Sequence, residues 1–244
     1  MKQVKYLLLF MAMAVPALRA DPDTDRPTPS PTLVQARVFR NLKLQDFKLE
    51  GDLHTLKKRY PLELQTRDRE MLYLFKDQPL QVRVVLDPAG ASVARRGGPN
   101  EAWKPVTGVA LKEKLLNTDV AYEDIGLSFI FWDQIRGIGT DSIKTLPAWC
   151  FEAVPPAATP SLYTKVRYWI SSEYYAFLRV DGYDAQDRII KRVEVNGVQQ
   201  IGEAYVIKEM EIETMVPGTE ISASRTYIDV ASGTPGSGLV AAPR

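Results

Sequence analysis

The sequence offers few residues that could catalyse a reaction. Ser-His-Asp and Cys-His mechanisms both need a histidine as general base, and His54 is the only histidine among the 244 residues. Because His54 follows a predicted turn at Gly51-Asp52, we expect its imidazole to be a solvated hairpin residue. Gly126-Leu127-Ser128-Phe129-Ile130 begins like a nucleophile elbow, but Ile130 replaces the second glycine. The sequence therefore gives Ser128 neither a base nor the turn that would expose it.

The sequence also lacks the ligands for metal or phosphate chemistry. A single histidine and a single cysteine exclude metal sites built on these residues, and no loop has the spacing of carboxylate ligands. Arg96-Gly97-Gly98 lacks the lysine of a phosphate-binding loop. Glu123 and Asp124 are adjacent, so on a helix they would point about 100° apart and could not share a substrate. We therefore expect a protein that is not an enzyme and holds no metal or cofactor.

The second half of the chain is dominated by amphipathic β-strands. About five consecutive strands fill residues 163–230, where apolar residues such as Val166, Tyr168 and Ile170 alternate with polar ones. We predict turns at residues 184–187 and at Pro217-Gly218. We also predict a type I′ hairpin turn at Asn196-Gly197, between strands at 188–195 and 204–215. A sheet with one apolar face must have that face covered.

The first half contains a second meander. Alternating or mostly apolar segments predict strands over residues 47–53, 60–65, 70–75, 80–84 and 91–95. The total of about 9–11 antiparallel strands could close into a barrel, form a β-sandwich or curl into an open barrel. Counting strands does not decide among these architectures.

The middle of the chain changes from the strand period to a helical one. Leu111 and Leu115, then Tyr122, Ile125 and Phe129, fall at helix-face spacings, with Thr118 or Asp119 as a cap between two short helices and Gly126 as the end of the second. Helices between two meanders suit a cover over the concave face of one sheet. A helix that only completes the core would give the same pattern. A further short helix is expected over residues 32–40, capped by Thr32.

The N-terminus has the features of a secretory signal peptide. Lys2 and Lys5 precede an apolar run over residues 6–15, and small residues up to Ala20 suit cleavage. The apolar run is about half of the roughly 20 residues needed to span a bilayer. We expect a soluble periplasmic protein with a signal peptide at 1–20, a Pro-rich flexible linker at 21–31, one domain at 32–230 and a flexible tail at 231–244.

Cysteine content and charge narrow the function further. Cys150 cannot form an internal disulfide, and its neighbours Trp149 and Phe151 indicate an inert core residue. Removing residues 1–20 leaves 28 Lys and Arg against 30 Asp and Glu, a net charge near −2. This balance argues against a nucleic-acid partner.

An ordered series of short segments resembles one known family. The series comprises Gly51-Asp52-Leu53, Tyr60-Pro61-Leu62-Glu63-Leu64, residues 69–75, Trp103, Ala121-Tyr122-Glu123-Asp124-Ile125, Trp149-Cys150-Phe151-Glu152-Ala153, residues 163–170 and Gly182-Tyr183-Asp184. In this order they resemble the outer-membrane lipoprotein-sorting (LolA-like) proteins of bacterial envelopes. The resemblance covers roughly residues 34–230. It implies a mainly β fold, an incomplete antiparallel β-barrel whose concave apolar face is covered by helices and receives acyl chains.

The resemblance, together with the strand alternation, gives candidate site residues. The apolar members of alternating pairs predict the wall of a lipid-binding cavity: Leu49, Leu62, Leu64, Val82, Val84, Leu178 and Val206. The helical segment predicts the lid: Leu115, Leu116, Tyr122, Ile125 and Phe129. The resemblance also implies an arginine that holds the lid shut, for which Arg83, Arg179 and Arg225 are candidates.

Three functions are compatible with these features. The first is a periplasmic carrier that binds lipid or lipoprotein acyl chains and delivers them toward the outer membrane, with an inner-membrane exporter and an outer-membrane acceptor as partners. The second is a lipid-sensing envelope regulator of the same fold that acts through a protein partner. The third is a β-sandwich adaptor with a dry core.

Overall fold

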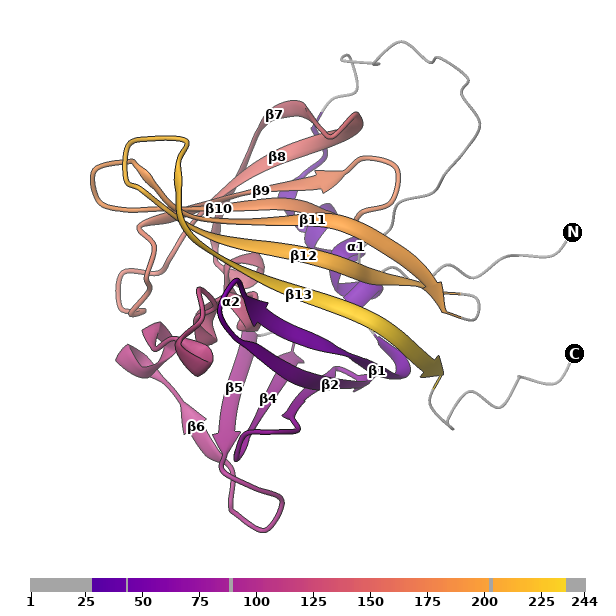
Figure 1. Ribbon diagram of the computed structural model, residues 1–244. Coiled ribbons are helices and arrows are strands. Elements are labelled where there is room, and N and C mark those ends of the chain that lie inside the picture. The colour runs from indigo at the N-terminus through magenta and orange to yellow at the C-terminus, as the bar shows by residue number, and fades with distance from the viewer. Residues whose placement is uncertain (1–27, 43, 88–89, 202–203, 236–244) are drawn as a thin grey trace, which may run out of the picture.

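The computed structural model describes residues 28–42, 44–87, 90–201 and 204–235. The predicted signal peptide and most of the predicted linker lie outside these residues. The described strands form one antiparallel sheet in two meanders (Figure 1). The first meander contains β1 Leu44–Thr55, β2 Arg59–Asp68, β3 Glu70–Phe75, β4 Leu80–Asp87, β5 Gly90–Arg96 and β6 Lys104–Val106. The second contains β7 Gln134–Ile143, β8 Leu146–Val154, β9 Lys165–Ser171, β10 Phe177–Tyr183, β11 Ile189–Ile201, β12 Ala204–Met215 and β13 Ser222–Pro235.

The two meanders are joined by one long-range pair of strands. β1 pairs with β13, so the order across the sheet is β6-β5-β4-β3-β2-β1-β13-β12-β11-β10-β9-β8-β7. β6 and β7 remain at the two edges, and the sheet does not close into a barrel. The prediction of an incomplete antiparallel barrel is confirmed, although the sheet has 13 strands rather than 9–11.

The helices pack on the concave face. They are α1 Pro31–Leu42, η1 Gly108–Lys112, η2 Leu115–Asn117, α2 Tyr122–Gly126 and η3 Ser128–Phe131, where η denotes a 3₁₀-helix. Val34 and Val38 of α1 are buried in the same core as Ile125 and Phe129, and Figure 1 shows α1 and α2 enclosed by the curved sheet. We call residues 107–133, which connect the two edge strands, the lid. No helix among the described residues is long and apolar enough to cross a membrane.

The helices differ in detail from the prediction. The lid contains short turns of 3₁₀-helix and one five-residue α-helix, which ends at Gly126 as predicted. Thr118 does not cap α2; its hydroxyl donates to the Leu115 carbonyl instead. In α1 the Ser30 hydroxyl, not Thr32, accepts the capping hydrogen bond, from the Leu33 N–H at 3.3 Å.

The Asn196-Gly197 turn was predicted wrongly. β11 continues through these residues to Ile201, and its pairing with β12 shifts register on both sides of Gly197. The dipeptide therefore forms a β-bulge, because pairing with the long β12 outweighs the local turn preference. The connection to β12 falls at residues 202–203, outside the described part of the chain.

Two other segments were assigned too little structure. β7 and the beginning of β8 occupy residues 134–146, for which no strand was predicted. Most side chains of edge strand β7 are exposed, so this segment lacks a clear alternation of apolar and polar residues. β13 extends to Pro235, which pairs with Phe47, so the first five residues of the predicted tail belong to a strand.

Candidate functional site

A cavity lies between the concave face of the sheet and the lid. Its volume is about 130 Å³. Its wall is almost entirely apolar and comes from both meanders, so the β1–β13 pairing creates it. Strand residues that line it include Leu49, Leu62, Leu64, Met71, Tyr73, Val166, Phe177, Val180, Lys191, Val193, Met210, Ile212, Ile228 and Val230. The lid contributes Val120, Glu123, Asp124, Ile125, Leu127, Phe129 and Trp132.

Three of the seven predicted wall residues line this cavity, namely Leu49, Leu62 and Leu64. Val82 and Val84 are fully buried on β4, in the main core. Because α2 packs against β4 and β5, it fills that side of the concave face and leaves the open space over the strands nearer the centre of the sheet.

Two predicted wall residues pack elsewhere. Val206 joins a small cluster with Leu49 and Val230, which themselves line the cavity. Leu178 lies in a separate cluster with Cys150 and Trp169, away from the cavity.

A β-bulge explains the placement of Leu178. The pairing of β10 with β9 shifts register between Phe177 and Arg179. The shift breaks the strict alternation, so Phe177 and Val180 both line the cavity and Leu178 does not.

The predicted lid residues divide into two groups. Ile125 and Phe129 line the cavity. Leu115 and Tyr122 are lid residues that are buried in the main core instead, and Leu116 is partly buried, with its carbonyl accepting a hydrogen bond from the Tyr60 hydroxyl at 2.8 Å. All five contribute to the packing of the lid, and none of these placements tests ligand binding.

Carboxylates fasten the lid to the sheet. Asp119 accepts hydrogen bonds from the hydroxyls of Thr214 at 2.7 Å, Ser224 at 2.5 Å and Thr226 at 3.0 Å. Burial favours the neutral form of Asp119, but these three hydrogen bonds outweigh it and lower the pKa of the carboxyl below its usual value. The lid is thus held to the adjoining ends of β12 and β13 by a charged group.

Asp124 and Glu123 make a second attachment. Asp124 accepts hydrogen bonds from the Ala121 N–H at 2.7 Å, from the Tyr163 hydroxyl and from Lys191 Nζ at 3.2 Å. Glu123 points elsewhere and accepts from the Leu162 N–H at 2.7 Å and from the Ser161 hydroxyl. Burial raises the pKa of Glu123 above its usual value, despite these hydrogen bonds.

Lys191 is the basic residue of the cavity wall. Its ammonium group donates to the Asp119 carbonyl and to Asp124, and the side chain is about 10% exposed. We call Lys191, Asp124 and Tyr163 the latch, because they join the lid to strand β11 and to the segment before β9.

The latch was missed at the level of the sequence, although signals for it exist. Lys191 occupies an apolar position of the alternation formed by Ile189, Val193 and Val195, which marks a lysine on the inward face. Tyr163 packs over Gly182, where a Cβ atom would lie 2.3 Å from the tyrosine ring. Tyr163, Gly182 and Asp124 all belong to the segments that carry the family resemblance.

The candidate arginines have other partners. Arg179 pairs with Asp181, Arg225 pairs with Glu211 and Glu213, and Arg83 stacks on Trp103. Arg95 of β5 does contact the lid, with hydrogen bonds to Glu113 at 2.8 Å and to the Tyr122 hydroxyl at 3.3 Å.

His54 and Cys150, which were considered for catalysis, are held by contacts with neighbouring residues of the sheet. His54 is not a solvated hairpin residue as predicted, because it lies within β1, its Nε2 is 2.7 Å from Asp229 Oδ2 and its ring stacks on Tyr227. Cys150 is a buried core residue as predicted, and burial raises the pKa of its thiol to about 12. Across the described ranges, no three His, Cys, Asp or Glu side chains form a group that could hold a metal ion.

Solved structures with this fold come from bacterial proteins. A DUF1329 family protein from Desulfovibrio piger is 16% identical over 87% of this chain and 95% of its own, with a TM-score of 0.69. A protein domain from Vibrio parahaemolyticus, described as outer membrane lipoprotein-sorting, is 15% identical over 80% of this chain and 87% of its own, with a TM-score of 0.67. A LolA superfamily protein from Nitrosomonas europaea is 12% identical over 85% of this chain and 94% of its own, with a TM-score of 0.54.

Sequence comparison gives a coarser assignment. A search of curated proteins found no match. A protein-family model described as "Uncharacterized protein" matches residues 101–233, which include the lid and strands β7 to β12. Since the match spans more than half of the sequence, the chain belongs to this uncharacterized family, and its fold is that of the LolA superfamily.

Proposed function

We propose that this protein is a periplasmic carrier that binds the acyl chains of a lipid or lipoprotein in the cavity and delivers them toward the outer membrane, without catalysing a reaction. The observation that carries the proposal is the apolar cavity enclosed by the sheet and by a lid with a polar latch. The fold shared with a domain described as outer membrane lipoprotein-sorting supports the same class of cargo.

The size of the cavity implies that the lid moves. A dry cavity of about 150 Å³ in another protein accommodates benzene, so the 130 Å³ present here suits a comparably small apolar group. A whole acyl chain needs more room, which displacement of α2 and η3 would provide. In this proposal, the arrangement of α2 and η3 described above is the closed position of the lid.

The apolar wall favours acyl cargo. An empty cavity of 130 Å³ destabilises a protein by about 3 kcal/mol relative to a filled one. Burial of about a dozen methylenes would contribute on the order of 10 kcal/mol. Release into water would then be very slow, so cargo must pass directly to another apolar surface.

The latch makes opening feasible. When the lid lifts, Lys191, Asp124 and Glu123 become accessible to water, which solvates the charges that the closed form had desolvated. A lid held only by apolar contacts would expose apolar surface without this compensation. Closing over an empty cavity lowers the net affinity for cargo by the free energy of opening, which keeps binding reversible.

Lipid extraction and transfer test the proposal. Solvent extracts of the protein purified from a bacterial periplasm should contain lipid or lipopeptide by mass spectrometry. The delipidated protein should take up a fluorescent fatty acid with saturable stoichiometry and lose it to acceptor liposomes. Folded protein that neither carries lipid nor takes up the fatty acid would contradict the proposal.

Transfer also separates a carrier from a lipid sensor. A sensor would retain its lipid in the presence of liposomes and would change its affinity for a protein partner on loading, through a coupling free energy of typically about 1–3 kcal/mol. Suppose that lipid loading changes the capture of an inner-membrane regulator tenfold, which corresponds to about 1.4 kcal/mol, while transfer to liposomes stays at background. The protein would then be a lipid-sensing regulator and not a carrier.

A further inference from the structure

Most of the strongly exposed apolar side chains of the described chain lie at one end of the molecule. Leu56 is 92% exposed, Val109 78%, Ile221 64% and Val216 39%. Leu56 is at the tip of the β1–β2 hairpin, Val109 is in η1 of the lid, and the other two flank the turn between β12 and β13. We call these four residues the lid-end tips.

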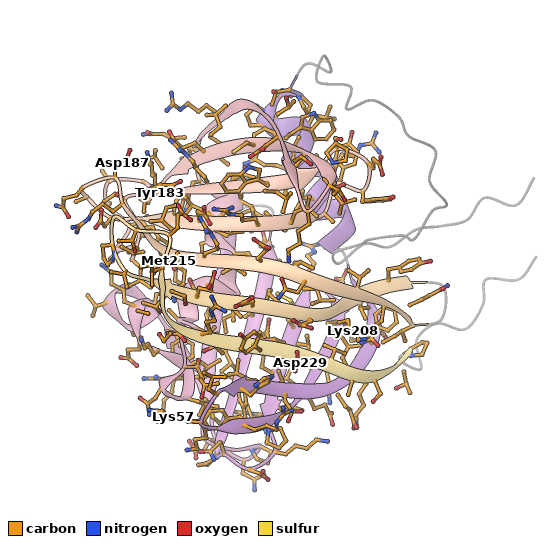
Figure 2. All side chains as sticks on the ribbon, turned by 45° about the horizontal axis from the view of Figure 1, so that its top comes forward. Lys57, Tyr183, Asp187, Lys208, Met215 and Asp229 are labelled. Carbon is orange, nitrogen blue, oxygen red and sulfur yellow. The ribbon has the colours of Figure 1, made fainter. Side chains whose placement is uncertain are left out.

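Strand register and lid contacts bring the lid-end tips to the same end. Thr55, next to Leu56, pairs with Thr226 on β13, and Thr214 near the end of β12 pairs with Ser224. Asp119 of the lid bonds to Thr214, Ser224 and Thr226. Figure 2 shows Lys57 and Met215, which adjoin these tips, at one end of the sheet, far from Lys208.

Several backbone N–H groups of the two hairpin tips are hydrogen-bonded within the tips. At the β1–β2 tip, the Lys57 and Lys58 N–H groups both donate to the Thr55 hydroxyl at 3.2 Å, and the Thr55 N–H donates to the Lys58 carbonyl at 2.8 Å. At the β12–β13 tip, Val216 N–H donates to the Ile221 carbonyl at 2.8 Å, and Ile221 N–H donates to the Thr219 hydroxyl at 3.1 Å. Such tips can enter an apolar phase without leaving these N–H groups unpaired.

Lysines surround the apolar tips. Lys57 and Lys58 follow Leu56, and Lys112 and Lys114 follow Val109; all four are exposed. For Lys57 and Lys112, no ion-pair partner is found among the described residues.

The acidic groups near the tips have basic partners of their own. Glu113 is 2.8 Å from Arg95, and Glu220 is 2.8 Å from Arg192. Lys114 lies 3.9 Å from Asp119, so Lys57, Lys58 and Lys112 are the local surplus of positive charge on a nearly neutral chain.

We propose that the lid end docks on the surface of a bilayer containing anionic lipid, with the lid-end tips inserted among the acyl chains and the four lysines at the headgroups. Charge complementarity and apolar tips with internally bonded backbone select a lipid surface as the occupant. Docking would place the lid, whose latch closes the cavity, against the membrane. Docking itself does not depend on the proposed function. Only its role, to load or release cargo at the membrane, rests on that function.

Vesicle flotation tests the docking. The full mature protein should float with vesicles of phosphatidylethanolamine and phosphatidylglycerol, bind less to pure phosphatidylcholine, and detach as salt is raised. The Leu56→Asp/Ile221→Asp variant should bind roughly tenfold more weakly. Leu33→Asp/Ile138→Asp is the matched control, because Leu33 on α1 and Ile138 on β7 are also exposed, and it should float like the wild type.

Fatty-acid uptake in vesicle-free solution keeps the two proposals separate. Leu56→Asp/Ile221→Asp should take up the fluorescent fatty acid like the wild type, because neither residue lines the cavity. Wild-type protein that ignores anionic vesicles, floats equally with both vesicle types, or floats no better than the tip variant would overturn docking, whatever the uptake. If the wild-type protein binds vesicles but takes up no fatty acid, the docking proposal stands and the carrier proposal is refuted.

Discussion

The Lys191 ammonium group on β11 lies 3.2 Å from the Asp124 carboxylate on α2, across 67 residues of sequence. This pair is the point at which the wall of the cavity meets its cover. Each partner also contacts a further group: Asp124 accepts from Tyr163, and Lys191 donates to the Asp119 carbonyl. The position of the lid therefore depends on a small polar cluster beside an otherwise apolar cavity.

Loss of the latch lysine should open the lid. Lys191→Met leaves Asp124 buried without its ion pair, and we expect lid closure to weaken by about 2 kcal/mol, because Tyr163 and Ala121 still donate to the carboxylate. Amides of residues 119–127 should then exchange with deuterium roughly thirtyfold faster. Hydrogen exchange with mass spectrometry measures this rate.

A second lysine serves as the control for this experiment. Lys144→Met breaks a half-exposed ion pair of 2.7 Å with Glu194 and should change lid exchange little, since such pairs contribute about 1 kcal/mol or less. A folded Lys191→Met protein with an unchanged lid would show that the latch does not hold it.

A charge in the cavity wall should abolish cargo binding. Leu64→Glu places a carboxylate against the cavity, where an acyl chain cannot solvate it. We expect uptake of a fluorescent fatty acid to be lost while circular dichroism remains native. Ile138→Glu also introduces a carboxylate in place of an apolar side chain, but on the exposed edge strand β7, and this variant should bind the fatty acid normally. Equal binding by both variants would show that the cavity is not the binding site.

The contact between Tyr163 and Gly182 gives a subtler perturbation of the latch. In Gly182→Ala the new Cβ would lie 2.3 Å from the Tyr163 ring, so the ring must shift, and with it the hydroxyl that donates to Asp124. We expect a loss of about 1–3 kcal/mol in the free energy of unfolding and faster lid exchange. At Gly197 a Cβ would be 3.8 Å from Lys208, and Gly197→Ala should leave the lid unchanged; a stable, protected lid in Gly182→Ala would refute this role.

Glu152 should make stability depend on pH. Burial opposes its charge, but hydrogen bonds from Arg136 and Arg167 and the nearby Lys165 lower the pKa of the carboxyl to about 2, from 4.5. The Glu152 carboxyl therefore binds its proton more tightly in the unfolded chain than in the folded one. Its contribution to the free energy of unfolding is fully present above pH 4.5 and is lost as the pH falls toward 2.

The Glu152→Gln substitution measures that contribution. We expect a loss of about 2 kcal/mol at neutral pH, reduced by solvent screening of the exposed Arg136, and a flatter stability curve between pH 4.5 and 2. Glu173→Gln controls for the change in net charge. Urea unfolding across this pH range would contradict the assignment if the two variants kept the same slope.

Local patterns in the sequence determined most strands and the general architecture. The 70–75 and 204–215 predictions match β3 and β12 at both ends, because alternation at period 2 depends on which face a residue presents. The helical character of the segment between the two meanders was also predictable, although the same period would arise from a helix that only completes the core. The ordered family segments then indicated the open barrel, which strand counting alone could not choose.

Only the tertiary structure decided which apolar residues face the cavity. Alternation defines two faces but not which is concave, and a single bulge near Phe177 directs Leu178 away while Val180 lines the cavity. α2 packs against β4, the strand that carries the buried Val82 and Val84, and no pattern in β4 could reveal this contact. The Lys191–Asp124 pair depends on a contact between elements 67 residues apart, and such contacts arise from the pairing of whole strands rather than from neighbouring residues.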